Sequence, residues 1–312
     1  MMSLVVYGHL LEPAVVAQQS HLALTLYLLI YLFHVPAWAF LAGITSKVET
    51  SIESSIRLFG VFAVFQVIYV CITGTFHNRF SEWIFTPWWV LWFLVSLISW
   101  KLLLPIALKF RWSLIVSVVI ALAVGTSEHI GRPFSLSRTF VWFPLFLAGN
   151  LYGKSILSHA KEATAITKAV ACASFLIAAV ALWVRPFGFQ SLYEGGSYSS
   201  AGFHSIGMGI AFRSGHFLLA CILGFASLCL VPKGKNVLTK YGTRTLSILV
   251  IHPFLVRLVQ HAGPRMSYPG SSIVCALCAA GIIWLSSTQP VHEYVSGIYR
   301  FPQRLFPAAQ EG

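Results

Sequence analysis

Three histidines and one glutamate stand out because each lies inside a long apolar run. His9, His34 and His252 all fall near the middle of such runs. Ionisable side chains at that depth are costly in a membrane, and they usually face a cavity or the interior of a helix bundle. His9 and Glu12 are three residues apart, so on a helix they share a face and the carboxylate can orient the imidazole. That pairing is typical of a general base, which takes a proton from a hydroxyl and passes it to a leaving group.

The common depth of the three histidines leads to the hypothesis that they converge on one cavity, although depth alone does not show which way each side chain faces. The alternative for each histidine alone is a structural residue with satisfied hydrogen bonds. An acyl-histidine intermediate is chemically possible, whereas no Gly-x-Ser-x-Gly elbow is present to supply a serine nucleophile. Glu12 is the only nearby carboxylate and no ligand-spaced pair lies on one helix, so we expect no metal. The six cysteines lie within apolar runs and are expected to serve in packing.

The elements that position these residues are membrane-spanning helices. Of the 312 residues, 57% are hydrophobic and 10% charged, and the mean hydropathy is +0.77, which excludes an ordinary water-soluble domain. Because a span takes about 20 apolar residues, we predict an all-α, polytopic transmembrane helix bundle of about ten spanning helices. It forms a single membrane domain over residues 1–312. The apolar runs cover approximately residues 3–19, 22–43, 56–75, 87–106, 112–127, 138–157, 166–184, 213–231, 243–262 and 271–290.

The net charge of +12 is explained by membrane topology. A nucleic-acid-binding protein gathers its basic residues on one exposed face, but here they are scattered through the breaks between apolar runs, so we expect no nucleic-acid partner. With alternating helices, the side of the N-terminus holds fourteen of the 21 basic residues and the opposite side holds seven. The seven are Arg79, Arg132, Arg138, Arg185, Arg213, Arg257 and Arg265. The positive-inside rule then predicts a multi-pass protein with both termini cytoplasmic.

The longest stretch that is not apolar covers residues 185–213 and is rich in Gly, Ser and aromatic residues. It falls on the side opposite the termini. Two interpretations are open: a lid or acceptor-binding loop, or a plain connector that dips into the membrane interface.

Five segments, in order along the chain, resemble those of a known enzyme family. They are YGHLLEP at 7–13, FHVPAWAFLAGITSK at 33–47, PWWVLWFLVSLISWKLLLP at 87–105, SRTFVWFPLFLAGNLYGK at 137–154 and YGTRTLSILVIHPFLV at 241–256. Together they are similar to the acyltransferase-3 family of integral membrane acyltransferases, in particular to its fucose 4-O-acetylase-like exopolysaccharide O-acetyltransferases. The resemblance implies transfer of an acetyl group from cytoplasmic acetyl-CoA to a hydroxyl of a glycan or lipid-linked oligosaccharide. It also implies a bacterial inner-membrane protein of exopolysaccharide biosynthesis.

The resemblance assigns the family's motif positions to individual residues. Its first-helix, second-helix and late histidines correspond to His9, His34 and His252. Its Leu-Trp-Phe-Leu tryptophan corresponds to Trp92, and the arginine before its Phe-Pro-Phe-Phe helix corresponds to Arg138. These assignments predict substrate-binding roles for Trp92, Arg138 and His252.

We predict His9, Glu12 and His34 as the catalytic residues, with His9 as the base. One departure from the family concerns a basic residue eleven positions before the first-helix histidine, which would here precede Met1. His9 lies so close to Met1 that, at about 1.5 Å per residue, we expect either a truncated first helix or a true start upstream of Met1. Two other functions therefore stay open. One is an inactive relative retained with polysaccharide-assembly proteins, and the other is a polysaccharide-precursor transporter, which would often show internal repeats.

Basic and aromatic residues near the ends of the runs supply further candidates. Lys101 and Lys154 are predicted to bind the phosphates of CoA, although for each lysine alone the positive-inside rule is the stronger explanation. Arg138 and Arg213 begin runs on the less basic side, where each could position an acceptor or extend to lipid headgroups. Trp92 suits either a sugar-stacking platform or the aromatic belt of a membrane protein.

Overall fold

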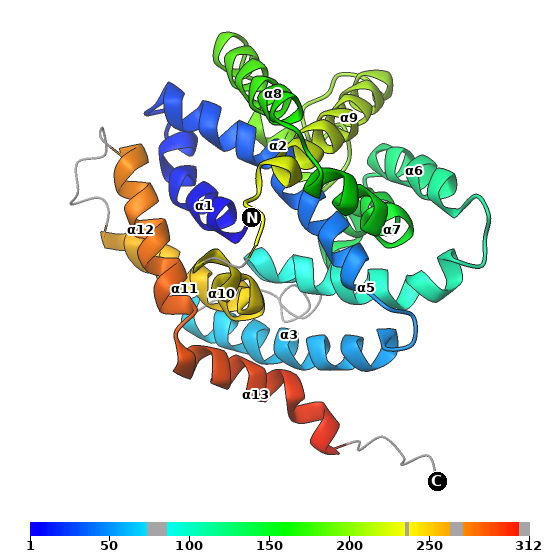
Figure 1. Ribbon diagram of the computed structural model, residues 1–312, viewed down its shortest axis with the longest axis vertical. Coiled ribbons are helices and arrows are strands. Elements are labelled where there is room, and N and C mark those ends of the chain that lie inside the picture. Colours follow the sequence, from blue (N-terminus) through cyan, green and yellow to red (C-terminus); the bar gives the residue numbers. More distant parts are fainter. Residues whose placement is uncertain (74–85, 235–236, 263–270, 306–312) are drawn as a thin grey trace.

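The computed structural model describes residues 1–73, 86–234, 237–262 and 271–305, and every regular element in these ranges is a helix (Figure 1). The α-helices are α1 (Met2–Val16), α2 (His21–Thr45), α3 (Ser51–Thr73), α5 (Trp92–Ala107), α6 (Ser113–Ala123), α7 (Leu136–Lys161), α8 (Ala165–Val184), α9 (Ile206–Leu230), α10 (Val237–Thr243), α11 (Thr245–Ala262), α12 (Ser271–Ser286) and α13 (Gln289–Leu305). Short 3-10 helices are η2 (Trp89–Leu91), η3 (Val124–Thr126), η4 (Pro133–Ser135) and η5 (Phe189–Tyr193). Each of the ten predicted apolar runs contains a helix, which confirms the all-α prediction.

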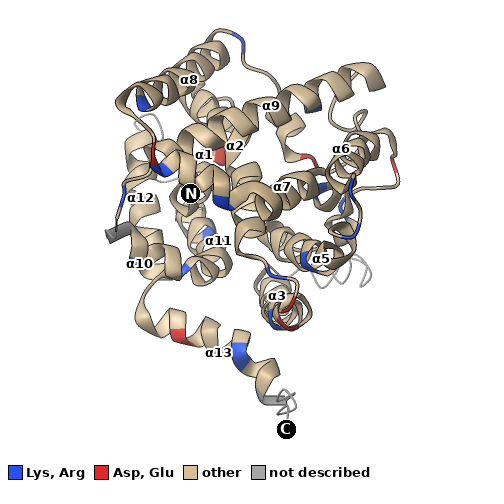
Figure 2. Ribbon diagram, turned by 45° about the vertical axis from the view of Figure 1, so that its right-hand side comes forward, with Lys and Arg blue, Asp and Glu red and all other residues tan. Residues whose placement is uncertain are grey.

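Six helices are long and apolar enough to cross a membrane, and the pair α12–α13, bent by 59°, would make a seventh. The prediction of ten spans is not confirmed, because α1, α6 and α12 are shorter and α7 is too polar. Only 11% of the apolar window of α8 is buried inside the protein, so that helix needs lipid around it. Charged residues are sparse along the helices (Figure 2). The architecture is therefore that of a polytopic helical membrane protein.

Helices α2 and α7 cross at the centre of the bundle because glycine lets their backbones touch (Figure 1). A Cβ atom at Gly43 would lie 1.9 Å from the carbonyl oxygen of Phe146, and one at Gly149 would lie 2.0 Å from that of Phe40. Small residues at such crossings are the usual way for membrane helices to pack closely. Asn150 strengthens the contact, since its Nδ2 donates to the carbonyl of Gly43 at 3.1 Å.

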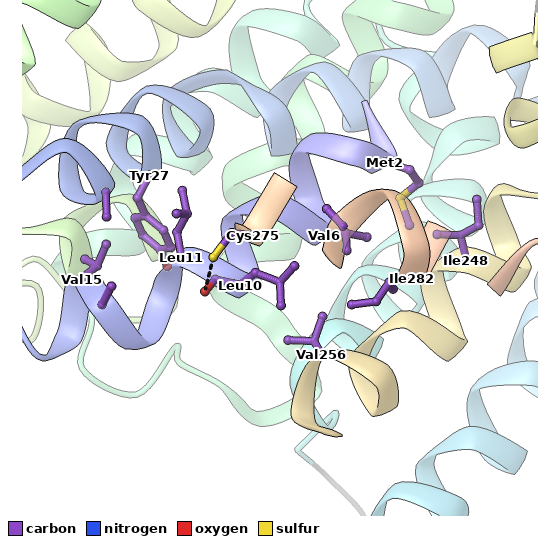
Figure 3. Close-up of a cluster of buried hydrophobic side chains, with 13 residues drawn as sticks. Met2, Val6, Leu10, Leu11, Val15, Tyr27, Ile248, Val256, Cys275 and Ile282 are labelled. Carbon is purple, nitrogen blue, oxygen red and sulfur yellow. Dashed lines mark hydrogen bonds between the residues drawn. The ribbon is translucent and has the colours of Figure 1, made fainter. Parts of the chain in front are cut away.

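Helix α1 is held in place by a core that it shares with α11 and α12 (Figure 3). Val6, Leu10, Leu11 and Val256 are all fully buried there. The thiol of Cys275 donates to the carbonyl oxygen of Leu10 at 3.7 Å. This packing fixes the rotation of α1, which sets the direction in which His9 and Glu12 point.

A proline provides a second anchor for α1. Pro13 has no N–H, so the carbonyl oxygen of His9, four residues earlier, loses its helical donor. Gln260 of α11 replaces that donor, its Nε2 donating to the His9 carbonyl at 2.9 Å. The backbone at His9 is thereby tied directly to α11.

Helix α13 was not among the predicted runs. It packs along α3 (Figure 1), where Gln303 donates to Glu53 at 2.9 Å and Glu53 also pairs with Arg57. Among the residues counted for topology, Arg79, Lys235 and Arg265 lie outside the described residues.

Candidate active site

A cavity of about 790 Å³ lies between α1, α2, α5, α7 and α11. One end, called here the Lys101 end, is lined by Thr45, Lys101, Thr245 and Tyr299. The other, called the Arg138 end, is lined by Arg132, Arg138, Tyr193 and Gly195. Tyr31 and Thr45 both line it from α2, and at 1.5 Å per residue this makes the cavity roughly 21 Å long. It therefore extends over most of the length of a spanning helix.

His9 and Glu12 lie together in the wall of this cavity. The Nδ1 atom of His9 is 3.7 Å from Oε2 of Glu12 and 3.5 Å from the hydroxyl of Tyr31. At that separation the carboxylate acts on the ring mainly as a nearby charge, which favours a proton on Nδ1. The other nitrogen, Nε2, has no hydrogen-bond partner among the described residues. With its proton on Nδ1, His9 would therefore have Nε2 as the free nitrogen that a general base needs.

Glu12 is held from the loop that joins α8 to α9. The hydroxyl of Tyr193 donates to Oε1 of Glu12 at 3.2 Å and lies 2.8 Å from the hydroxyl of Tyr27. Burial, with the charge of Glu12 in addition, raises the pKa of the Tyr193 phenol, so it stays protonated and remains a donor. Residues 189–195, called here the roof segment, therefore contact α1 and α2 through Tyr193 and hold Glu12 in place.

Aromatic rings enclose the imidazole of His9. The ring of Trp89 lies edge-on at 4.9 Å between centroids, and the ring of His252 stacks at 5.7 Å. Trp89 has a backbone φ of 41°, a left-handed conformation that is strained for a bulky residue. Arg257 covers the same indole, its guanidinium carbon 5.2 Å from the ring centroid. The strained turn thus brings Trp89 into contact with both His9 and the cation of Arg257.

His34 and His252 share a hydrogen-bonding pattern that differs from that of His9. Each donates from Nδ1 to the carbonyl four residues earlier, His34 to Ile30 at 2.9 Å and His252 to Ile248 at 2.7 Å. A carbonyl can only accept, so Nδ1 carries a proton in each ring, and in the neutral ring Nε2 is the unprotonated acceptor. His34 lines the cavity, whereas His252 is fully buried behind His9.

Arg138 dominates the opposite end of the cavity. Its Nε donates to the carbonyl oxygen of Tyr193 at 2.8 Å, and its guanidinium carbon lies 4.8 Å from the ring centroid of Trp92. These two contacts fix the plane of the guanidinium. Arg138 therefore also holds the roof segment in place.

Arg213 has a different environment, because a buried carboxylate neutralises it. It pairs with Glu194 at 2.6 Å, and both side chains are 3% exposed. Its NH1 donates to the carbonyl of Ala121 at 2.8 Å, one of the unpaired carbonyls at the end of α6. His216 completes the cluster, with Nδ1 3.4 Å from Glu194. This cluster fastens the loop after α8 to α6 and α9.

Of the nine predicted site residues, six line the cavity: His9, Glu12, His34, Trp92, Lys101 and Arg138. The structure brings His252 against His9 but outside the lining, and it places Arg213 in the buried ion pair. Lys154 is exposed on α7, away from the cavity.

Sequence reasoning missed Tyr31 and Tyr193. Tyr31 lies three residues before His34, a spacing that puts both on one helix face, and their rings meet at 4.6 Å. That spacing was a usable signal. Tyr193 lies in the polar stretch considered as a lid, but nothing in the sequence singled it out.

No protein-family model matches this chain, and no curated protein or solved structure proved similar to it. No group of three or more metal-binding side chains occurs within the described ranges. The resemblance to membrane acyltransferases therefore stays a prediction, and function must be argued from the cavity itself.

Proposed function

We propose that this protein is a membrane-bound O-acyltransferase that moves an acetyl group from acetyl-CoA to a hydroxyl of a glycan or its lipid-linked precursor. The observation that carries the proposal is the His9–Glu12 pair in the wall of a cavity that extends over most of the length of a spanning helix. Acyl transfer to a hydroxyl needs a base within reach of two substrates that arrive separately.

The Lys101 end suits the donor. Positive charge is expected to face the cytoplasm, where acetyl-CoA is made available, and Lys101 supplies a cation at that end of the cavity. Beyond it the lining is mostly apolar, with Leu97, Leu41 and Trp38 along the way to His9. An uncharged thioester arm fits such a passage, while the phosphates of the donor stay at its mouth.

The reaction balances with His9 alone as proton carrier. Its Nε2 takes the proton of the acceptor hydroxyl as that oxygen attacks the thioester carbonyl, and the carbon–sulfur bond then breaks. The departing thiolate receives the same proton, so the products are an O-acetyl ester and the free thiol of CoA. Glu12 stabilises the imidazolium formed between the two transfers.

The test uses purified protein with radiolabelled acetyl-CoA and membrane glycans, with CoA release and label transfer both measured. His9→Ala should lower the rate by about 10²- to 10⁴-fold, as expected for loss of a general base. His159→Ala, which removes an exposed histidine on the last turn of α7, is the matched control and should keep the wild-type rate.

A wild-type protein that releases no CoA would contradict the proposal, as would a His9→Ala variant of normal rate. Uptake of labelled precursor into vesicles without acetyl-CoA would instead favour a transporter. A long cavity lined by several ionisable side chains also suits transport, so both measurements belong in the experiment.

A further inference from the structure

We infer that the acceptor carries a negatively charged group, a carboxylate or a phosphate, and that Arg138 and Arg132 bind it at the Arg138 end of the cavity. The inference deepens the proposed function, because it names the chemical class of the acceptor. Binding can be measured without any reaction, so the two are tested separately.

The guanidinium of Arg138 is fixed but not neutralised. Its Nε is used on the carbonyl of Tyr193, and its face rests on Trp92. A guanidinium offers five donors in a planar fork that matches carboxylate and phosphate oxygens. With Nε engaged, its terminal nitrogens remain for a ligand in the cavity that Arg138 lines.

The balance of charge around the cavity also favours an anion. Its charged lining residues are Glu12, Lys101, Arg132 and Arg138. Glu12 already accepts from Tyr193 and lies beside His9. Neither Arg132 nor Arg138 forms an ion pair within the part of the chain that the structure describes. An anionic ligand would supply the ion-pair partner that these two arginines lack.

Space for the ligand comes from glycine. Gly131 and Gly195 line the cavity beside the two arginines. A Cβ atom at Gly195 would lie 3.3 Å from NH2 of Arg138, so any side chain there would occupy the volume next to the terminal nitrogens. Ser135 lines the same end and adds a hydroxyl.

The position of the anion follows from this geometry. Arg138 holds the backbone of Tyr193, and the hydroxyl of Tyr193 holds Glu12 beside His9. An acidic sugar bound at Arg138 therefore lies next to the residues that set the base. Two sources share this chemistry: the carboxylate of an acidic sugar, and the phosphate that joins a sugar to its lipid carrier.

The experiment measures binding to the full-length protein in detergent, without acetyl-CoA, by calorimetry. The probes are methyl β-glucuronoside, α-glucose 1-phosphate and methyl β-glucoside, which differ in charge on a similar ring. We expect the charged probes to bind at least about 10-fold more tightly than the neutral one. Arg138→Gln should remove that preference, with a loss of about 10- to 100-fold for the charged probes.

Two further variants at exposed positions separate a loss of binding from a folding defect. Arg132→Gln alters an exposed side chain and should weaken the binding of the charged probes by a smaller factor, about 3- to 10-fold. Arg185→Gln removes an exposed arginine that does not line the cavity and should bind all probes like the wild type.

Binding of glucuronoside would identify an acidic sugar, and binding of the sugar phosphate alone would identify the lipid-linked phosphate. Equal binding of all three probes, or unchanged selectivity in both Arg132→Gln and Arg138→Gln, would overturn the inference. His9-dependent release of CoA together with equal binding would leave the proposed function standing and remove only the acceptor class.

Discussion

Two glutamate–histidine pairs contact the roof segment, and their surroundings differ. Glu12 and His9 line the cavity with side chains 29% and 12% exposed. Glu194 and His216 are 3% and 1% exposed and have no access to it. Tyr193 contacts the first pair and its neighbour Glu194 belongs to the second, so a single turn of chain connects them.

The two histidines differ in how their ring nitrogens are used. His216 has partners on both, since Nδ1 faces Glu194 and Nε2 donates to the carbonyl of Leu32 at 3.1 Å. His9 has partners on Nδ1 only. A histidine with both nitrogens occupied can hold helices together but cannot exchange a proton with a substrate. The free nitrogen and the cavity, rather than the residue pair, distinguish the candidate base.

The largest expected effect comes from removing the ion-pair partner of Glu194, and it is a loss of stability. Arg213→Met leaves Glu194 buried without its countercharge, which should lower the free energy of unfolding by about 3–5 kcal/mol. Thermal unfolding of the purified protein in detergent measures the change. The double variant Arg213→Met with Glu194→Gln should recover part of the loss, because no buried charge is left unpaired. If the single variant unfolds like the wild type, the buried pair is not the anchor described here.

The contrast also shows what the sequence could reveal. Apolar runs predicted the helices, and spacing predicted that His9 and Glu12 meet, because both depend on local periodicity. Arg138 and Arg213 could not be separated, since each begins an apolar run on the same predicted side of the membrane. What separates them is Glu194, whose place beside Arg213 depends on tertiary packing of a loop.

Proline illustrates the same limit. Pro36 frees the carbonyl of Leu32 just as Pro13 frees that of His9, and both consequences are readable from the sequence. The partners that occupy those carbonyls, His216 and Gln260, come from helices far along the chain. The sequence therefore predicts which carbonyl lacks its helical donor, but not which side chain donates to it instead. The predicted number of spans stays unconfirmed for a related reason, because packed helices such as α1 need not be long enough to cross a membrane on their own.

An effect of intermediate size, on the rate of acetyl transfer, is expected at the His9–Glu12 pair that lines the cavity. Glu12→Gln removes the charge next to His9 while keeping the acceptor for Tyr193, so the rate of acetyl transfer should fall by about 10- to 100-fold. Stability should change by less than about 1 kcal/mol, since the side chain is partly exposed. Glu162→Gln, an exposed residue after α7, serves as control. If Glu12→Gln is strongly destabilised but keeps a normal rate per folded molecule, the His9–Glu12 pair has a structural role, like the His216–Glu194 pair.

The smallest effect is expected at Tyr193, which connects the His9–Glu12 pair to the His216–Glu194 pair. Tyr193→Phe removes only the hydroxyl that donates to Glu12 and leaves the backbone carbonyl that Arg138 binds. One hydrogen bond to a carboxylate should be worth about 1 kcal/mol here, so the transfer rate should fall by about 2- to 10-fold. Tyr152→Phe, on an exposed face of α7, should leave the rate unchanged. If Tyr193→Phe lowers the rate only in proportion to a loss of folded protein, the roof segment merely closes the bundle. If the rate falls at constant stability, the roof segment sets the base through Glu12, and the loop after α8 becomes part of the catalytic apparatus.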